Sequence, residues 1–536
     1  MNRARGTSRP MTTSALPAPG PAALAVERAD ALLDAAFGQR LNPMRHLGAL
    51  GFFFFWICCA SGIWIYVGFD TSALGARESL AAMDRGDWPL GAFARALHRY
   101  SADAVVAVTA LHLVRELARR HYAAFRRFAW LTGLFALALM LLAGINGYWL
   151  AWDQLAQWSL TATIEWFDVL PVFDGSLARN VIDGGQVNDR FFSLLTFLHI
   201  GLPLGMLAAM WAHVQRVSPA RTSPPRDLAW GSAAMLAALS LARPISLMPA
   251  ADLAFLPSRI PLDWFFLFPH PVMAWLGPDG LWTVVAAFFA LLAALPWATR
   301  VPRAPAARVN LDNCNGCARC FADCPYDAVV MVPRTDSRHH PRQAEVDPLL
   351  CAGCGVCTGA CPSSTPFRRD EVLATGIDMP SAAIGELRAR LEARTVALEG
   401  GPRIVVFGCR WGAATDALES RSTAAIEFLC AAMAPPSFVE YALRAGADGV
   451  LVAACREGDC EFRTGDAIVA ARVAGERRPA LRPSVPRERV RLAHAGRSDH
   501  AALRRELDDF RAALSRLGPR AADHPSLPKR QEIRHG

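Results

Sequence analysis

The sequence contains little charge for its length. Only 19% of its 536 residues are Asp, Glu, Lys or Arg, whereas 53% are apolar. A soluble chain of this size usually carries more charge, so part of the protein is expected to lie in a membrane. The length also exceeds that of one ordinary domain. We therefore expect several domains, at least one of which is membrane-bound.

Two further features are absent. Residues 1–21 lack an apolar core ahead of a small-residue cleavage site, so no secretory signal peptide is evident and the N-terminus is expected to stay inside the cell. Basic stripes interleaved with aromatic residues are also missing, which argues against binding of nucleic acid. The net charge of +8 is better explained by membrane topology.

Long apolar runs are frequent in the first 300 residues. We find six of them, at 46–69, 95–118, 128–150, 191–214, 228–247 and 280–298. Each is long enough to cross a hydrocarbon core of about 30 Å as a helix. The alternative, buried helices of a large soluble protein, is disfavoured because so many runs fall close together.

The arginines between these runs indicate an orientation. They flank alternate membrane ends, at Arg40, Arg45, Arg119, Arg120, Arg126, Arg127, Arg216, Arg221, Arg226, Arg300, Arg303 and Arg308. The opposite connections carry mostly acidic residues, namely Glu78, Asp84, Asp87, Asp168, Asp174, Asp183 and Asp252. Because cytoplasmic loops are enriched in arginine, both termini are expected to be cytoplasmic, in a bacterial inner membrane.

Four histidines lie within two of the apolar runs. His98 and His112 are 14 positions apart in the second run, and His199 and His213 are 14 apart in the fourth. In a helix this spacing places two imidazoles about 21 Å apart on nearly the same face. Ionisable residues inside a membrane are costly and usually functional. Two facing helices therefore predict two bis-histidine haem sites, His98 with His199 outside and His112 with His213 inside.

Glycines repeat with the same spacing in the first and third runs. Gly48 and Gly62 are 14 apart, as are Gly133 and Gly147. A porphyrin inside a four-helix bundle needs space at each haem level, which glycine provides by having no side chain. The alternatives are that a buried histidine only donates hydrogen bonds and that small residues only serve helix packing.

Three other residues in this region are less specific. Arg95 precedes His98 by three residues and is a candidate partner for a haem propionate, although a surface arginine explains it equally well. Cys58 and Cys59 in the first run are interpreted as small buried apolar residues.

Residues 40–300 resemble cytochrome b of respiratory bc and photosynthetic bf complexes. Besides the histidines and glycines, the likeness rests on residues 146–154, Asn-Gly-Tyr-Trp-Leu-Ala-Trp-Asp-Gln, in which Ala151 replaces the family's proline. Residues 260–265, Ile-Pro-Leu-Asp-Trp-Phe, are similar to the family's Pro-Glu-Trp-Tyr signature of outer quinol oxidation. The resemblance implies two b haems and a quinone or quinol substrate, with Asp263 as the candidate quinone-site residue. The last two helices of a full-length cytochrome b are missing, so residues 221–300 are similar to part of the photosynthetic companion subunit.

After Pro305 the apolar runs stop and cysteines become frequent. Two runs with the spacing Cys-x-x-Cys-x-x-Cys-x-x-x-Cys-Pro begin at Cys314 and at Cys351. This is a duplicated bacterial ferredoxin signature, in which the fourth cysteine of each run binds the other cluster. One 4Fe-4S cluster is thus expected on Cys314, Cys317, Cys320 and Cys361, and the other on Cys351, Cys354, Cys357 and Cys324. Zinc is the less favoured alternative.

Four cysteines follow in a segment with the pattern of a small α/β domain. Residues 403–407 and 449–453 are apolar strands that lead to Cys409 and Cys455, while Cys430 follows another apolar stretch and Cys460 lies five residues after Cys455. Cysteines at strand ends can converge on one site. Scattered buried thiols are the alternative.

Residues 402–520 resemble the delta subunit of methyl-viologen-reducing hydrogenases, which links a donor to heterodisulfide reductase. The matching residues include Gly-Ala-Asp-Gly-Val-Leu-Val at 446–452, Cys455, Gly-Asp-Cys at 458–460 and Leu-Gly-Pro at 517–519. The resemblance implies a 2Fe-2S cluster on Cys409, Cys430, Cys455 and Cys460. Gly412 stands where the family often has a further cysteine.

The expected architecture is therefore multidomain. A six-helix transmembrane di-haem bundle precedes an α+β ferredoxin-like domain and a small α/β domain. The expected bounds are 1–45 for a cytoplasmic tail with an amphipathic segment, 46–220 for the di-haem bundle, 221–300 for two further helices, 306–366 for the ferredoxin domain, 372–400 for a linker helix, 402–520 for the α/β domain and 521–536 for a basic tail.

The expected function is electron transfer between the quinone pool and a cytoplasmic flavoprotein or heterodisulfide-reductase-like partner. Membrane lipid and a second copy of the chain complete the expected partners. One alternative is a bc-type quinol-oxidising cytochrome b working with a Rieske protein. Another is a membrane anchor for a soluble reductase that has no substrate site of its own.

Overall fold

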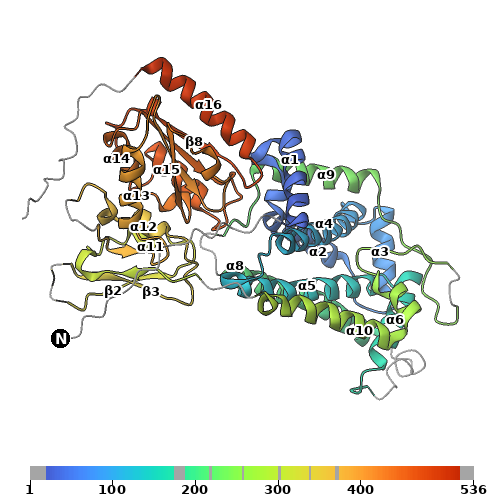
Figure 1. The fold of residues 1–536 in the computed structure, drawn as a ribbon. Coiled ribbons are helices and arrows are strands. Elements are labelled where there is room, and N and C mark those ends of the chain that lie inside the picture. The colour runs from blue at the N-terminus through green and yellow to red at the C-terminus, as the bar shows by residue number, and fades with distance from the viewer. Residues whose placement is uncertain are drawn as a thin grey trace, which may run out of the picture. The chain divides into compact units, whose positions relative to one another are not determined.

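The computed structural model describes residues 20–173, 187–215, 220–255, 259–299, 304–336, 338, 340–368 and 373–518. It forms two compact units (Figure 1). The helical unit comprises Arg28–Gln215 and Ala220–Val301, and the cysteine-rich unit consists mainly of Pro302–Gly536. Several charges used above for the topology, and the predicted basic tail, lie outside the described residues: Asp174, Asp183, Arg216, Arg300, Arg303 and 521–536.

The helical unit is built around a four-helix bundle. Helix α2 (Leu47–Gly68) packs on α4 (Gly91–Ala118), and α5 (Arg127–Trp149) packs on α8 (Asp189–Val214). Phe54, Val105, Met140 and Met206, one from each helix, meet in a shared apolar core. The other helices are α1 (Pro21–Leu41), α3 (Gly75–Arg85), α6 (Gln154–Asp168), α9 (Arg226–Ala242) and α10 (Pro269–Ala298).

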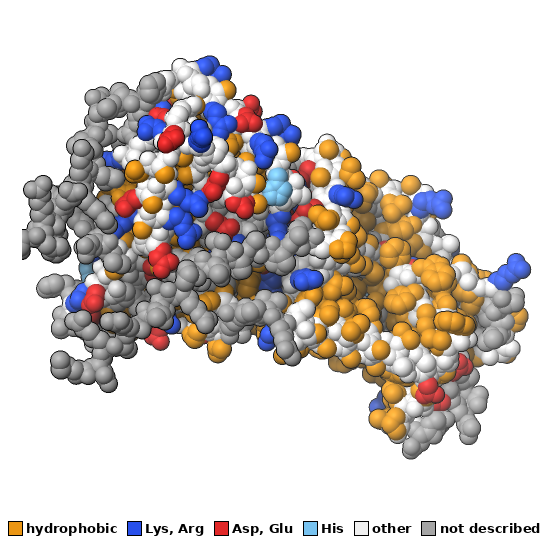
Figure 2. All heavy atoms as spheres, viewed as in Figure 1, with side chains coloured by type: hydrophobic (Ala, Val, Ile, Leu, Met, Phe, Trp, Pro, Cys, Tyr) orange, Lys and Arg blue, Asp and Glu red, His pale blue; other side chains and the backbone are white. Residues whose placement is uncertain are grey.

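Four helical segments have the length and composition to cross a membrane. They are Leu47–Gly68, Ala124–Trp149, Asp189–Val214 and Pro269–Ala298. Figure 2 shows apolar side chains over much of the face of this unit that is in view, and large side chains such as Trp211 and Phe197 are mostly exposed, as expected of a lipid-facing surface. The protein is therefore a multi-pass membrane protein.

The prediction of six spanning helices is confirmed for four of them. Helix α4 forms as predicted, but five charged residues dilute its apolar character: Arg95, Arg99, Asp103, Arg115 and Glu116. Helix α9 has only 17 residues, fewer than the predicted run of 228–247. Neither is among the four apolar segments, so their crossing of the membrane stays a prediction.

Helix α1 lies in the segment predicted to be amphipathic, and its amphipathic character stays a prediction. The carboxylate of Asp30 on this helix is fully buried and accepts hydrogen bonds from Arg115 at 2.7 Å and from Arg119 at 3.0 Å. Asn42 donates to the backbone oxygen of Asp30 at 3.0 Å. These bonds attach α1 to the end of α4.

The first part of the cysteine-rich unit is a small α+β fold. Strand β2 (Val329–Pro333) pairs antiparallel with β3 (Arg342–Val346), and β1 (Arg308–Val309) pairs with β4 (Ile377–Asp378). Each cysteine run enters a short helix, α11 (Arg319–Ala322) or α12 (Val356–Ala360). Because β4 lies in the predicted linker of 372–400, that segment belongs partly to this fold. The predicted linker helix itself is α13 (Ile384–Val396).

The second part is a parallel α/β sheet. Strands β5 (Ile404–Cys409), β6 (Thr423–Phe428), β7 (Gly449–Ala454) and β8 (Val490–His494) follow the order β6-β5-β7-β8. Helices α14 (Pro436–Arg444), α15 (Gly465–Ala474) and α16 (His500–Leu517) accompany them. All six residues of β5 are buried, which explains its continuous apolar sequence. The two strands predicted at 403–407 and 449–453 are confirmed as β5 and β7.

Candidate functional site

His98 on α4 and His199 on α8 face each other across the bundle. Their ring centroids are 6.2 Å apart. Imidazole nitrogens bind transition metals at about 2 Å, so two axial rings on one metal have centroids roughly 6 Å apart. His98 Nδ1 donates to the Cys58 carbonyl at 2.9 Å, and His199 Nδ1 donates to the Ala143 carbonyl at 3.1 Å. These bonds leave each Nε2 for a metal, so the pair fits a bis-histidine haem iron.

Glycines on the neighbouring helices make room for these two rings. A Cβ added at Gly62 would lie 2.9 Å from Cε1 of His98, and one at Gly147 would lie 2.8 Å from Cε1 of His199. Such distances are too short for a methyl group. Gly62 and Gly147 therefore let α2 and α5 approach the imidazole edges, and the predicted clearance for a porphyrin stays a prediction.

The second pair follows the same pattern in part. Nδ1 of His213 lies 3.2 Å from Oγ1 of Thr132, and a Cβ at Gly133 would lie 3.0 Å from Cε1 of His213. Gly48 differs, because nothing lies within 4 Å of its added Cβ. His112 is half-buried on α4. Its predicted pairing with His213 stays a prediction.

Arg95 and Cys58 have partners that their sequence positions did not indicate. Arg95 forms an ion pair with Asp84 of α3, so a propionate would compete with that carboxylate. Sγ of Cys58 lies 3.5 Å from Nδ1 of His98. Cys58 therefore contacts a candidate haem ligand, whereas Cys59 packs against the apolar core as predicted.

Asp263, the candidate quinone-site residue, is held in a polar cluster. Its side chain is 7% exposed, Arg99 lies 3.0 Å away as an ion-pair partner, and the hydroxyl of Tyr148 donates to it. Arg99 also donates to Asp103 at 3.1 Å and covers the Tyr148 ring. Sequence reasoning identified Asp263 and the run containing Tyr148 but not Arg99 or Asp103. Arg99 and Asp103 are one helical turn apart on α4. Ion pairs with this spacing are common on helices, so the sequence contained no specific signal for a functional site.

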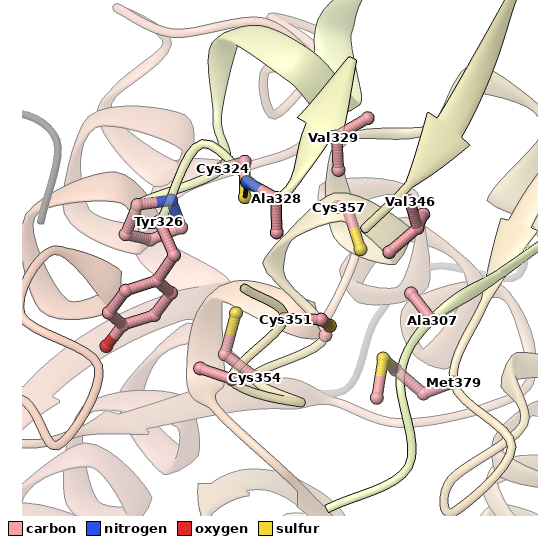
Figure 3. Close-up of a pocket in the computed structure, with 13 residues that line it drawn as sticks. Ala307, Cys324, Tyr326, Ala328, Val329, Val346, Cys351, Cys354, Cys357 and Met379 are labelled. Carbon is pink, nitrogen blue, oxygen red and sulfur yellow. Dashed lines mark hydrogen bonds between the residues drawn. The ribbon is translucent and has the colours of Figure 1, made fainter. Parts of the chain in front are cut away.

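The eight ferredoxin-type cysteines line two cavities. One cavity, with about 290 Å³ of empty space including space open to solvent, is lined by Cys314, Cys317, Cys320 and Cys361. The other, with about 320 Å³, is lined by Cys324, Cys351, Cys354 and Cys357 (Figure 3). Each cavity thus takes its fourth cysteine from the other run, in agreement with the grouping predicted from the signature.

Burial raises the pKa of a thiol in each of these cavities. Burial, followed by the nearby thiols of Cys361 and Cys317, raises the pKa of Cys320 to about 12. Burial likewise raises the pKa of Cys357 well above its usual value. No three His, Cys, Asp or Glu side chains in the described ranges are close enough together to hold a single metal ion. The chemistry of each four-thiol set suits an iron–sulphur cluster, whose iron would supply the positive charge that the thiolates need.

The four late cysteines converge at one edge of the parallel sheet. Cys409 ends β5, Cys430 follows β6 and Cys455 follows β7, and the carboxyl ends of parallel strands lie along the same edge. Sγ of Cys409 and Sγ of Cys455 are 3.4 Å apart. All four thiols, including Cys460 in the next loop, are buried. The structure therefore favours one four-cysteine site over scattered thiols.

The first turn of α15 closes this four-cysteine site. A Cβ at Gly465 would overlap Sγ of Cys430 and lie 3.1 Å from Sγ of Cys460. Hydrogen bonds from the Cys430 and Cys455 thiols lower the pKa of Cys409 and of Cys460. The type of cluster that the four thiols hold stays a prediction.

Three family models match separate parts of the chain. Residues 32–219 match cytochrome b/b6/petB, residues 313–365 match the 4Fe-4S dicluster domain, and residues 404–518 match the methyl-viologen-reducing hydrogenase delta subunit. These matches confirm the predicted fusion. The cytochrome b match implies b-type haem, and the dicluster match implies iron–sulphur clusters.

Three curated relatives match between 26% and 37% of the chain. Cytochrome b6 of Gracilaria tenuistipitata var. liui is 27% identical over 37% of this chain and 92% of the relative. Cytochrome b6 of Oltmannsiellopsis viridis is 31% identical, over 26% and 65%. The menaquinol:cytochrome c reductase cytochrome b subunit of Geobacillus thermodenitrificans is 24% identical, over 34% and 88%. A solved hyperthermophilic respiratory Complex III aligns with a TM-score of 0.40 at 21% identity, covering 51% of this chain and 82% of that one.

Proposed function

We propose that the protein carries electrons between a soluble cytoplasmic partner and membrane quinone. The observation that carries this proposal is the presence, in one chain, of a membrane histidine pair shaped for haem and three separate cysteine sites. The partner is proposed to be a flavoprotein or a heterodisulfide-reductase-like protein, because residues 404–518 match a hydrogenase delta subunit.

Each proposed cofactor has its own set of ligands. Two b haems are assigned to His98 with His199 and to His112 with His213. Two 4Fe-4S clusters are assigned to the two cavities described above, and a 2Fe-2S cluster to Cys409, Cys430, Cys455 and Cys460. Such cofactors take up and release single electrons, while the protein holds them in order and excludes water.

The overall reaction balances without oxygen or a further reductant. A reduced flavin on the partner gives up two electrons, one at a time, and releases its protons to water. A quinone in the membrane takes up two electrons and two protons and becomes quinol. The arginine distribution supports a cytoplasmic position for the partner. The reverse direction uses the same residues.

The cluster around Asp263 bears on the alternative of a bc-type quinol oxidase. That alternative is supported by the relative named menaquinol:cytochrome c reductase cytochrome b subunit. A carboxylate that accepts a proton from quinol must have a lone pair within hydrogen-bond reach of the quinol hydroxyl. The Asp263 carboxylate already binds Arg99 and Tyr148, and its side chain is only 7% exposed. We therefore propose that quinone reacts elsewhere, towards the inner haem.

The proposal is tested with the purified full chain in lipid nanodiscs. A reduced low-potential viologen serves as donor and a soluble quinone analogue as acceptor, and haem absorbance and quinol formation are followed together. We expect quinone-dependent turnover that Asp263→Asn leaves unchanged. Absence of turnover would support the passive anchor. Loss of turnover in Asp263→Asn would support the bc-type alternative.

A further inference from the structure

Helix α12, which carries Cys357, packs directly on the turn after Cys430. A Cβ added at Gly359 of α12 would overlap the carbonyl oxygen of Ala432, and one at Gly355 would lie 2.6 Å from Sδ of Met433. Ala432 and Met433 belong to a 3-10 turn, η6 (Ala431–Met433), that follows Cys430 immediately. Glycine at position 359 allows α12 to meet the backbone of η6, and Gly355 leaves room for the side chain of Met433. The 4Fe-4S cavity of α12 and the four-cysteine site are therefore neighbours.

A second observation also indicates that these two sites are adjacent. The pKa of the Cys354 thiol is raised by burial first and then by the nearby thiols of Cys324, Cys351 and Cys460. Three of these four thiols line the same cavity, whereas Cys460 belongs to the four-cysteine site. For Cys320 in the other cavity, the thiol neighbours that raise the pKa are Cys361, Cys317 and Cys314.

Arg472 of α15 bridges the two neighbouring sites. Its Nη2 donates to the carboxylate of Asp323 at 2.5 Å, and Asp323 directly precedes Cys324. Its Nη1 donates to the carbonyl of Ala432 at 2.6 Å, two residues after Cys430. The added Cβ of Gly359 would lie 2.8 Å from this Nη1, so the guanidinium also lies against α12.

Two arginines share the single carboxylate of this bridge, so its net charge is positive. Asp323 is shared by Arg472 and by Arg477, whose Nε donates at 2.8 Å, so two cations face one anion. The side chain of Arg472 is 1% exposed, whereas that of Arg477 is 40% exposed. Buried ion pairs are weak contributors to stability, because desolvation offsets their attraction. An electrostatic effect on the adjacent cysteine sites therefore explains the buried Arg472 better than a contribution to stability does. A buried cation favours the more negative, reduced state of a nearby iron–sulphur cluster.

We propose that Arg472 is a positioning residue for electron transfer between these two sites. Single electrons pass between the four-cysteine site and the site of Cys324, Cys351, Cys354 and Cys357, oxidising one centre and reducing the other without a proton or a bond change. Among the three cysteine sites, the site of Cys314, Cys317, Cys320 and Cys361 exchanges electrons only with the second of these, and it would pass them on towards the haems. This order rests on the proposed electron-transfer function and on a reductant of the flavin class.

The test uses the purified full chain, with iron content measured first and the centres followed by paramagnetic resonance during a redox titration. In Arg472→Gln the two neighbouring centres should lose electron affinity relative to the third centre, by about tenfold. Arg477→Gln is the matched control, because it removes a charge from the same carboxylate at a solvent-screened position. It should change the electron affinity of the two neighbouring centres, relative to the third, by about twofold or less. Arg472→Lys keeps the charge and should restore most of this relative electron affinity.

Two results would overturn the proposal. The first is an unchanged electron distribution in Arg472→Gln with full iron content. The second is an equal shift in all three centres.

A second measurement stays decisive if Arg472→Gln does not fold. Cys460→Ser removes the four-cysteine centre, and spin relaxation is compared with the wild type after chemical reduction. The 4Fe-4S signal of the site next to the four-cysteine centre should relax more slowly, because its neighbouring spin is gone. The signal of the other 4Fe-4S site should change little. An equal change in both signals, or in neither, would reject the order. Because no quinone or partner takes part, failure here is distinguishable from failure of the proposed function.

Discussion

The two units present candidate ligands in different ways. In the helical unit, His98 and His199 project from long helices, and their positions follow from helix geometry. In the cysteine-rich unit, most ligands lie on loops, short helices and strand ends, as at Cys314, Cys409 and Cys455. A helix spreads its sites along an axis, whereas converging loops gather several thiols around one cavity. We therefore expect that removing one ligand in the bundle affects one haem site only. Removing the four-cysteine site, where electrons from the partner are proposed to enter, should instead stop electron transfer from the partner to all the other centres.

Loss of the four-cysteine site is the most severe test of this difference. Cys409→Ser should abolish haem reduction by the cytoplasmic donor, because no other entry site is proposed, while haem reduction by quinol remains. Both routes are measured by stopped-flow absorbance of the haems. Cys59→Ser is the control and should leave both routes intact. Equal loss of both routes, or of neither, would reject the entry site.

Replacement of a single axial histidine should have a partial effect. His199→Leu should remove the outer haem only and His213→Leu the inner haem only, so that haem per chain falls by about half. Pyridine haemochrome analysis and iron content give the count. The control is His270→Gln, which changes a buried histidine that contacts Thr163 at 2.9 Å and is not a proposed ligand. Loss of both haems in a folded single variant would contradict the independence of the two sites.

A smaller effect is expected where a glycine touches an imidazole. In Gly147→Ala the new methyl group would meet His199 at 2.8 Å, so the helices must separate slightly. Overpacking of this kind costs about 1–3 kcal/mol. Thermal unfolding should occur at lower temperature, and the outer haem spectrum should change while the inner one does not. A change confined to the inner haem would contradict the position given to Gly147.

The smallest effect on stability is expected at Gly48. Nothing lies within 4 Å of an added Cβ there, so Gly48→Ala should change the free energy of unfolding by about 1 kcal/mol or less. If the open space accommodates a porphyrin, as predicted, occupancy of the inner haem should still fall. Gly51→Ala on the same helix, where the nearest atom is 3.9 Å away, is the control. Full inner-haem occupancy in Gly48→Ala would reject the porphyrin role.

Much of the cysteine-rich unit could be predicted because its signals are local. The spacing of the two ferredoxin runs correctly indicated which four cysteines line each cavity, since the crossed grouping is a property of the signature. The strands that lead to Cys409 and Cys455 were also recognisable as apolar runs. The pairing of β4 with β1 was not, because a two-residue strand leaves no pattern in the sequence.

The sequence by itself indicated that His98 and His199 face each other, which cysteines line each ferredoxin-type cavity, and the three-part organisation. It could do so because regular helices and short cysteine motifs translate spacing directly into geometry. Tertiary structure alone decided that Asp263 is occupied by Arg99, that Arg95 is paired with Asp84, and that Cys58 touches His98. It also decided that Arg472 reaches Asp323 from 149 residues away. Contacts of this kind depend on how separate elements pack, and a single sequence contains no local pattern from which that packing can be derived.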